Sequence, residues 1–359
     1  MTVVLLNALP YSTDDGGFTT ALDNIVQSLD KQDLYRILLI FPKKYINCKL
    51  ISSIKKIDIC EYAVPAKGKF LLPYFVLNDI AKKVNADIVH SEISGHFVKS
   101  RCNVITLHDL SFITYPTHNR DAYSYLLWNV LYPQSMKRAT IVKVVSNCTL
   151  QDAIKFYPKN NYKLVWPKCN PIIKSGLQIR DWSIPLRILM VGSIIPRKNI
   201  GFAIRALEMA DLDYTLDIVG KTSWGFMDIR ELIDRNNRIN FHNYIDDDAL
   251  DLLYTNADLY ISSSFYEGFG YPVVEALSHS CPVFLSNTSS YVDLVSDIYR
   301  FDLNYQNFLT KFSKLLVTKR SEVLNDQVII LDKFTEDNHI KAHLELYEYA
   351  LSQYRRING

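Results

Sequence analysis

The chain has 359 residues, of which 48% are hydrophobic and 12% aromatic, a composition that excludes a disordered protein and leaves room for two domains. The net charge of +2 hides an asymmetry, because residues 1–173 carry 21 Lys and Arg against 13 Asp and Glu, whereas residues 174–359 carry 19 against 25. Six scattered cysteines argue against a disulfide framework or zinc cluster, and no apolar run reaches the roughly 18 residues of a membrane span, so we expect a cytoplasmic protein.

The first half alternates short apolar runs with segments of helical spacing, which predicts a doubly wound α/β domain over residues 1–173. Gly16 and Gly17 lie in the first turn of this domain, immediately before an expected helix. A glycine backbone there lets a phosphate or sugar approach closely, although such a pair is also a common plain turn. The expected strands are residues 2–7, 34–41, 87–90, 103–107 and 140–146, and the expected helices are residues 18–29, 120–138 and 147–157.

Residues 67–75, KGKFLLPYF, place two lysines beside aromatic and aliphatic side chains. Such a segment suits contact with an anionic membrane surface, where each cation contributes about 1 kcal/mol. The alternative is a solvated loop followed by a buried helix start. The basic first half as a whole predicts an anionic partner.

His108 and Asp109 follow the strand expected at residues 103–107. The carboxyl ends of strands in open α/β sheets face the ligand crevice, so His108 is a candidate site residue, although an isolated histidine at a strand end is also commonly structural. Asp109 either orients the imidazole or belongs to the loop.

Residues 174–185 lack periodicity and contain glycine and proline, which predicts a linker. The strand and helix alternation then restarts, so we expect a second α/β domain over residues 174–337. The tail, residues 338–359, has helical spacing.

The second domain begins with a strand at residues 187–191, followed by Gly192 and then by Arg197 and Lys198 at an expected helix start. Arg197 offers a planar fork for phosphate oxygens and Lys198 a compact charge. Two adjacent cations are often merely solvated, but this position after a strand and a glycine favours a phosphate site. Further on, Asp246-Asp247-Asp248 precedes a helix and is interpreted as its N-cap, not as a metal-binding cluster.

Residues 258–286 predict a strand, a glycine loop, a helix that begins near Tyr271, and another strand. The free N–H groups of that helix start suit a phosphate. Glu267 in the loop and Glu275 in the helix are strong acceptors for sugar hydroxyls. Because a carboxylate beside a phosphate is repelled by about 1 kcal/mol at 4 Å in water, and by more in a drier site, we expect cations close by.

The segment EGFGYPVVEA, from Glu267 onward, resembles the E-x7-E signature of retaining glycosyltransferases with the two-lobed GT-B fold, in particular the mannosyltransferase-like group of glycosyltransferase family 4. Gly16-Gly17, HDLSF at 108–112 and VGSIIPRKN at 191–199 are similar to other segments of that family. The resemblance implies two Rossmann-like domains facing a central cleft, with the C-terminal helix crossing back to the first domain. The chain departs from the family at Ser280, where relatives often have glycine.

The resemblance also implies roles for individual residues. Glu275 would hold the ribose, His108 and Glu267 the transferred sugar, and Arg197 with Lys198 the diphosphate, so that His108, Glu267, Arg197 and Lys198 form the catalytic set. The remaining donor-binding residues would be Gly17, Gly192, Tyr244 beside the base, Gly268, Phe269, Gly270 and Tyr271.

The implied reaction is the transfer of a hexose, with mannose favoured, from GDP-mannose or a UDP-sugar to a hydroxyl of a glycan or lipid-linked acceptor, with retention at the anomeric carbon. The departing phosphate would accept the proton of the acceptor, without a metal ion or other cofactor. Such an enzyme would serve surface polysaccharide or glycolipid assembly, at the inner face of the cell membrane if its acceptor is an anionic lipid. No nucleic-acid partner is expected. The alternatives are a nucleotide-sugar 2-epimerase of similar fold and a non-catalytic, transferase-like partner subunit.

Overall fold

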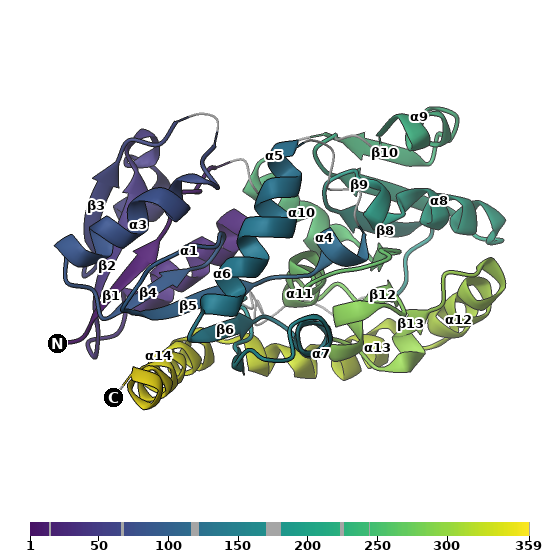
Figure 1. Cartoon of the computed structure of the whole chain (residues 1–359). Coiled ribbons are helices and arrows are strands. Elements are labelled where there is room, and N and C mark those ends of the chain that lie inside the picture. Colours follow the sequence, from purple (N-terminus) through teal and green to yellow (C-terminus); the bar gives the residue numbers. More distant parts are fainter. Residues whose placement is uncertain are drawn as a thin grey trace. The chain divides into compact units, whose positions relative to one another are not determined.

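The structure is a computed structural model that describes residues 1–13, 16–65, 68–115, 122–169, 181–222, 226–243 and 245–358. The chain forms two compact units, each an α/β unit in Figure 1: an N-terminal unit of Met1–Lys168 with Thr335–Gly359, and a C-terminal unit of Cys169–Phe334. The expected boundaries at 173 and 337 lie a few residues later in the chain than these divisions. Most of the expected linker at 174–185 lies outside the described residues.

The N-terminal unit is built on a parallel sheet with the strand order β3-β2-β1-β4-β5-β6-β7. From β1 the chain moves outward to β3 and then returns to the other side of β1, so the strand order reverses between β1 and β4. The central strands β1, β4, β5 and β6 are almost entirely buried, because helices cover both faces of such a sheet, whereas the edge strands β3 and β7 are partly exposed. The strand bounds are β1 Val3–Asn7, β2 Arg36–Pro42, β3 Asp58–Tyr62, β4 Ile88–Ser91, β5 Cys102–Leu107, β6 Ile141–Val144 and β7 Tyr162–Leu164.

The helices of this unit pack their apolar faces on the sheet. The helix expected at 18–29 is confirmed as α1, whose stripe of Leu22, Ile25, Val26 and Leu29 is buried. The helix expected at 120–138 is described from residue 122 and contains a π-helical segment. The bounds are α1 Gly17–Leu29, η1 Lys43–Tyr45, α2 Lys49–Ser53, α3 Leu72–Lys83, α4 Ser111–Thr114, α5 Ala122–Tyr125, η3 Leu126–Leu131, α6 Tyr132–Arg138 and α7 Asn147–Phe156.

The last helix, α14 (Glu336–Asn358), returns to the N-terminal unit, where it lies beside α1 and β5 (yellow in Figure 1). Its Leu346, Tyr347 and Ala350 are fully buried in the same core cluster as the apolar face of α1. The interior of this unit is therefore built from both ends of the described chain.

The C-terminal unit has the parallel strand order β10-β9-β8-β11-β12-β13, which reverses between β8 and β11. The strands are β8 Leu186–Val191, β9 Tyr214–Val219, β10 Ile239–His242, β11 Leu259–Ser262, β12 Val283–Ser286 and β13 Arg300–Phe301. The helices are η4 Pro196–Lys198, α8 Ile200–Met209, α9 Phe226–Asp234, α10 Asp247–Asn256, α11 Tyr271–Ser278, η5 Ser289–Asp293, η6 Asp297–Tyr299, α12 Tyr305–Val317, α13 Arg320–Val328 and η7 Ile329–Phe334.

Both units confirm the fold class that the sequence predicts, namely two Rossmann-like, doubly wound α/β units. Among the residues that the structure describes, no helix combines the length and the apolar character needed to cross a membrane. The points where the strand order reverses, one in each unit, are where sheets of this kind bind ligands.

Candidate functional site

In the C-terminal unit the candidate site lies where β8 and β11 end. These two strands are hydrogen-bonded neighbours and run parallel, so the loops that follow them, residues 192–199 and 263–270, leave the same edge of the sheet. The loops are also joined directly, because the backbone N–H of Phe265 donates to the carbonyl of Arg197 at 2.9 Å. Two predicted site segments that are far apart in sequence are thus brought together.

Three charged side chains from these loops form one cluster. Arg197 Nη1 lies 3.0 Å from Glu267 Oε2, and Lys198 Nζ lies 2.7 Å from Glu267 Oε1, with all three side chains largely buried. Ser264 Oγ donates to Oε1 at 2.8 Å. Burial alone would raise the pKa of Glu267, but Arg197, Lys198 and Ser264 outweigh it and lower the pKa to about 2. The expectation that cations lie beside this carboxylate is confirmed, and two cations against one carboxylate leave a charge of +1 for an anion.

The two cations are held by a short turn, which differs from the expected helix start. Arg197 and Lys198 lie in the 3-10 turn η4, and Asn199, with φ 49°, separates that turn from α8. The side chains, and not the N–H groups of α8, are therefore what this loop offers to a phosphate. Arg197 Nη1 also donates to the carbonyl of Tyr266.

Gly192 has φ 143°, a conformation that side chains disfavour, and a Cβ there would stand 3.1 Å from Lys198 Cε. The glycine therefore gives Lys198 the room to reach its carboxylate.

The start of α11 also matches the prediction, since the helix begins at Tyr271 with Pro272 in its first turn. Gly270 precedes it with φ 100°, and a Cβ there would lie 2.8 Å from Tyr291. Phe269 is only 4% exposed and packs against Tyr271 and Phe334. Its side chain belongs to the core, and its backbone carbonyl accepts a hydrogen bond from Ser290 Oγ at 2.9 Å.

Glu275 lies on α11, where Tyr254 from α10 donates a hydrogen bond to its Oε2 at 2.9 Å. Burial raises the pKa of Glu275, and this effect outweighs the hydrogen bond from Tyr254. Burial also raises the pKa of Tyr260 well above its usual value, and both Glu267 and Glu275 are among the charges that add to it.

Ser280, which stands where the resembled family often has glycine, has φ 58°. Ser280 follows His279, the C-cap of α11, and a left-handed conformation just after a helix end is the physical reason that glycine suits the position.

The structure gives no ligand-binding geometry for two other predicted donor-binding residues, Tyr244 and Gly17. Tyr244 lies outside the described residues, and Gly17 is the exposed first residue of α1.

The cap interpretation of Asp246 is confirmed, since its side chain accepts from the N–H of Ala249 at 2.8 Å. Within the described part of the chain, no three His, Cys, Asp or Glu side chains are grouped as a metal ion requires. The expectation of a metal-independent reaction stays a prediction.

His108 follows β5 in the N-terminal unit. Its Nε2 donates to the backbone carbonyl of Glu92 at 2.7 Å, and burial lowers the pKa of the imidazole despite the nearby Glu92 carboxylate. Asp109 accepts from both the N–H and the hydroxyl of Ser111, at 2.8 and 2.6 Å. Of the two interpretations of Asp109, the structure supports a loop residue that shapes the turn into α4.

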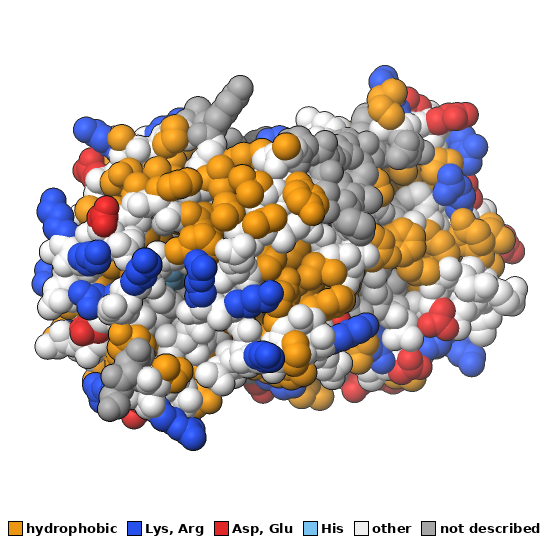
Figure 2. All heavy atoms as spheres, in the orientation of Figure 1, with side chains coloured by type: hydrophobic (Ala, Val, Ile, Leu, Met, Phe, Trp, Pro, Cys, Tyr) orange, Lys and Arg blue, Asp and Glu red, His pale blue; other side chains and the backbone are white. Residues whose placement is uncertain are grey.

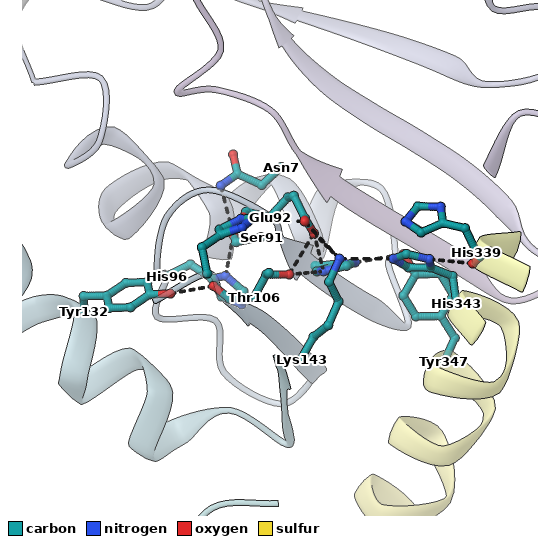
Figure 3. A network of polar contacts seen from close by, with 12 residues as sticks. Asn7, Ser91, Glu92, His96, Thr106, Tyr132, Lys143, His339, His343 and Tyr347 are labelled. Atoms are coloured by element: carbon teal, nitrogen blue, oxygen red, sulfur yellow. Dashed lines mark hydrogen bonds and ion pairs between the residues drawn. The ribbon is translucent and has the colours of Figure 1, made fainter. Parts of the chain in front are cut away.

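A buried polar network beside His108 was missed by sequence reasoning (Figure 3). At its centre Lys143 Nζ contacts both carboxylate oxygens of Glu92, at 2.7 and 2.9 Å, and each side chain is less than 5% exposed. One signal was available: Lys143 interrupts the apolar run Ile141–Val145, and a charge inside a buried strand needs a partner.

Part of the chain is similar in sequence to known proteins. The sequence model of the family described as glycosyl transferases group 1 matches residues 183–335, which is most of the C-terminal unit. Over 217 residues the chain is 28% identical to O-antigen chain mannosyltransferase B of Escherichia coli, an alignment that covers 54% of this chain and 55% of that protein.

The whole chain also resembles solved structures in its fold. Sucrose-phosphate synthase from Thermosynechococcus elongatus has a TM-score of 0.74 at 15% identity, covering 98% of this chain and 100% of that chain. Anabaena Alr3699/HepE, solved in complex with UDP and glucose, has a TM-score of 0.69 at 19% identity, covering 97% and 100%.

The resemblance to GT-B glycosyltransferases is therefore confirmed. The C-terminal unit matches the model of glycosyl transferases group 1, and the chain as a whole has the two-unit fold of these structures. The chain spans about half the length of the curated relatives it matches.

Proposed function

We propose that this protein is a retaining glycosyltransferase that moves a hexose, with mannose favoured, from a nucleoside diphosphate sugar to a hydroxyl of a glycan or lipid-linked acceptor in the assembly of a surface polysaccharide or glycolipid. The bond between the anomeric carbon and the diphosphate oxygen breaks, and the bond to the acceptor oxygen forms on the same face. The acceptor proton passes to the departing phosphate, and the nucleoside diphosphate leaves.

The observation that carries this proposal is the buried Arg197, Lys198 and Glu267 cluster at the reversal of strand order. As the sugar departs, negative charge gathers on the diphosphate. A buried site with a charge of +1 stabilises that charge more in the transition state than in the bound donor, which is the condition for catalysis. Glu275, held by Tyr254, is the acceptor that we assign to the ribose hydroxyls.

Mannose is favoured for two reasons. The HDLSF segment at 108–112 resembles the mannosyltransferase-like group, and a curated relative is named O-antigen chain mannosyltransferase B. The structure of Anabaena Alr3699/HepE holds UDP and glucose, which keeps a UDP-sugar as the second donor to be tested.

The test begins with the melting temperature of the protein in UDP, GDP, UDP-glucose and GDP-mannose, in the presence of EDTA. One nucleotide family is expected to raise it, because a ligand at about 100 times its Kd stabilises the folded state by roughly 2.7 kcal/mol. Lys198→Met should abolish the effect. The matched control Lys221→Met, at an exposed lysine of the same unit, should not.

Transfer of the labelled sugar to a lipid-linked or soluble glycan acceptor is then followed, with the anomeric configuration of the product read by NMR. Retention supports the proposal. If none of the four compounds raises the melting temperature and no sugar is transferred, the proposal is wrong. A C2 epimer of the donor formed without any acceptor would identify the enzyme as a 2-epimerase.

For the acceptor we propose a lipid-linked glycan reached from an anionic membrane surface. The N-terminal unit as the structure defines it carries 24 Lys and Arg against 17 Asp and Glu. Figure 2 shows apolar side chains gathered on the face that bears α3 and α5, with Lys and Arg beside them. Phe75 of α3 is 73% exposed, Tyr125 at the end of α5 56%, and Leu126, the first residue of η3, 42%. At the start of α3, Pro73 and Tyr74 are buried, as the alternative of a buried helix start predicts, and only Phe75 is largely exposed; Lys67 lies outside the described residues.

This part of the proposal is tested by sedimentation with vesicles of phosphatidylcholine alone or with 30 mol% phosphatidylglycerol, a composition chosen as a roughly physiological anionic content. We expect binding only to the anionic vesicles, and Phe75→Ser should weaken it without changing the melting temperature, because the ring is largely exposed. Absence of binding at low salt would favour a soluble acceptor instead.

A further inference from the structure

The hydrogen bond made by His108 determines which of its ring nitrogens carries the proton. Nε2 lies 2.7 Å from the backbone carbonyl of Glu92, and a carbonyl only accepts, so Nε2 must bear the hydrogen. Burial keeps the imidazole neutral, so Nδ1 has a free lone pair. Within the described part of the chain Nδ1 makes no hydrogen bond, and the side chain is 16% exposed. His108 therefore presents an acceptor to whatever binds beside it.

The carbonyl that fixes this tautomer belongs to a residue whose own side chain is anchored. The Glu92 carboxylate accepts from Lys143 Nζ at 2.7 and 2.9 Å and from Thr106 Oγ1 at 2.7 Å. It also lies 3.7 Å from His108 Nε2, so its charge favours a proton on that nitrogen. Both the position of the Glu92 backbone and the local field thus act on the same atom of His108.

The remaining partners leave little freedom in this network (Figure 3). The third proton of Lys143 reaches His343 Nε2 at 3.2 Å, which must accept it, while His343 Nδ1 donates to the carbonyl of His339 at 2.9 Å. On the other side, His90 Nε2 donates to Thr106 Oγ1 at 3.0 Å, because the hydroxyl proton of that threonine is already given to the carboxylate. Tyr347 then donates to His90 Nδ1 at 2.9 Å.

Each proton in this network therefore has one consistent position. Burial lowers the pKa of both His90 and His343, so these rings stay neutral around the single ion pair.

We propose that Glu92 is a positioning residue, and that its buried ion pair with Lys143 holds His108 in the Nε2–H tautomer so that Nδ1 accepts a hydrogen bond from a hydroxyl of the transferred sugar. The inference rests on the proposed function for the identity of the ligand, but the tautomer itself is a property of the free protein. A fixed acceptor orients the sugar before its anomeric bond breaks, which lowers the entropic cost of reaching the transition state.

The tautomer is measured by 15N NMR of the imidazoles, with His108 assigned by comparison with His108→Gln. Because removing one charge alone leaves the other buried and unpaired, the test variant is the double substitution Glu92→Gln/Lys143→Met, which removes both. The matched control is Lys168→Met/Glu336→Gln. This ion pair lies in the same unit, with N and O 2.7 Å apart and the lysine 1% exposed.

Wild type and control should show only the Nε2–H tautomer. In the double variant, with circular dichroism unchanged, both tautomers should be populated, and kcat should fall roughly tenfold to a hundredfold with little change in KM for the donor, as is typical when the outer partners of a functional group are removed.

A folded double variant that keeps the Nε2–H tautomer alone would overturn the inference. If instead the tautomers mix as expected while His108→Gln turns over normally, the positioning by Glu92 stands and the assigned role of His108 in transfer fails. If wild type and the control variant transfer no sugar, the proposed function fails, and the NMR result still decides the inference.

Discussion

The substitution Glu267→Gln gives the sharpest test of the charged cluster. The ordinary pKa of 4.5 is lowered to about 2 in the folded protein, which at about 1.4 kcal/mol for each pH unit is about 3 kcal/mol of stabilisation. The side chain is only 8% exposed, so solvent screening removes little of it. Because the folded-state pKa is depressed, the stabilisation is present above pH 4.5 and is lost as the pH falls toward 2. Urea unfolding at pH 7 should therefore show a variant less stable by about 3 kcal/mol.

Glu275→Gln is the matched control, because it removes the other carboxylate of the same segment. The pKa of Glu275 is raised by burial, so its ionised form is disfavoured in the folded state and its loss should cost no stability at pH 7. Inorganic pyrophosphate should raise the melting temperature of Glu267→Gln more than that of wild type, since it replaces the missing anion. Equal stability of Glu267→Gln and wild type at pH 7 would refute the reasoning.

Three further predictions concern single contacts. Tyr254→Phe leaves Glu275 Oε2 without its donor, and isothermal titration calorimetry should show nucleoside diphosphate binding weakened about fivefold to tenfold, at roughly 1 kcal/mol for a hydrogen bond. Gly270→Ala should lower the unfolding free energy by about 1–3 kcal/mol, because of its φ of 100° and the contact with Tyr291, as urea titration can measure. Tyr347→Phe removes a buried hydroxyl donor and should cost about 1–3 kcal/mol in the same assay.

The sequence was sufficient to predict those parts of the candidate site whose residues lie close together in the chain. The strand, glycine loop and helix around Glu267 and Glu275 are local features, set by apolar runs, a positive-φ glycine and a proline at the helix start. The partnership of Arg197 and Lys198 with Glu267 was also predictable, because a buried carboxylate beside an anion site requires cations. The 3-10 turn at Pro196–Lys198 could not be predicted, because the same residues can begin either a 3-10 turn or an α-helix.

The network around Glu92 could not be predicted, because its members come from β4, β5, β6 and α14 and meet only through the strand order and the return of the last helix. Tyr254 was missed for a related reason: it resembles any apolar-face residue of an amphipathic helix until α10 is placed against α11. Periodicity gives the buried face of an element but does not give its neighbour.

The discontinuity of the N-terminal unit has a consequence for biosynthesis. Cys169–Phe334 is one uninterrupted stretch and can fold as soon as it leaves the ribosome, whereas the first unit lacks His343 and Tyr347 until the segment beyond residue 334 has been made. Until then Lys143 lacks its partner His343, and His90 lacks its partner Tyr347, although all strands of the first sheet have already been synthesised. Nascent chains arrested before residue 335 should therefore be more sensitive to protease in the first unit than in the second.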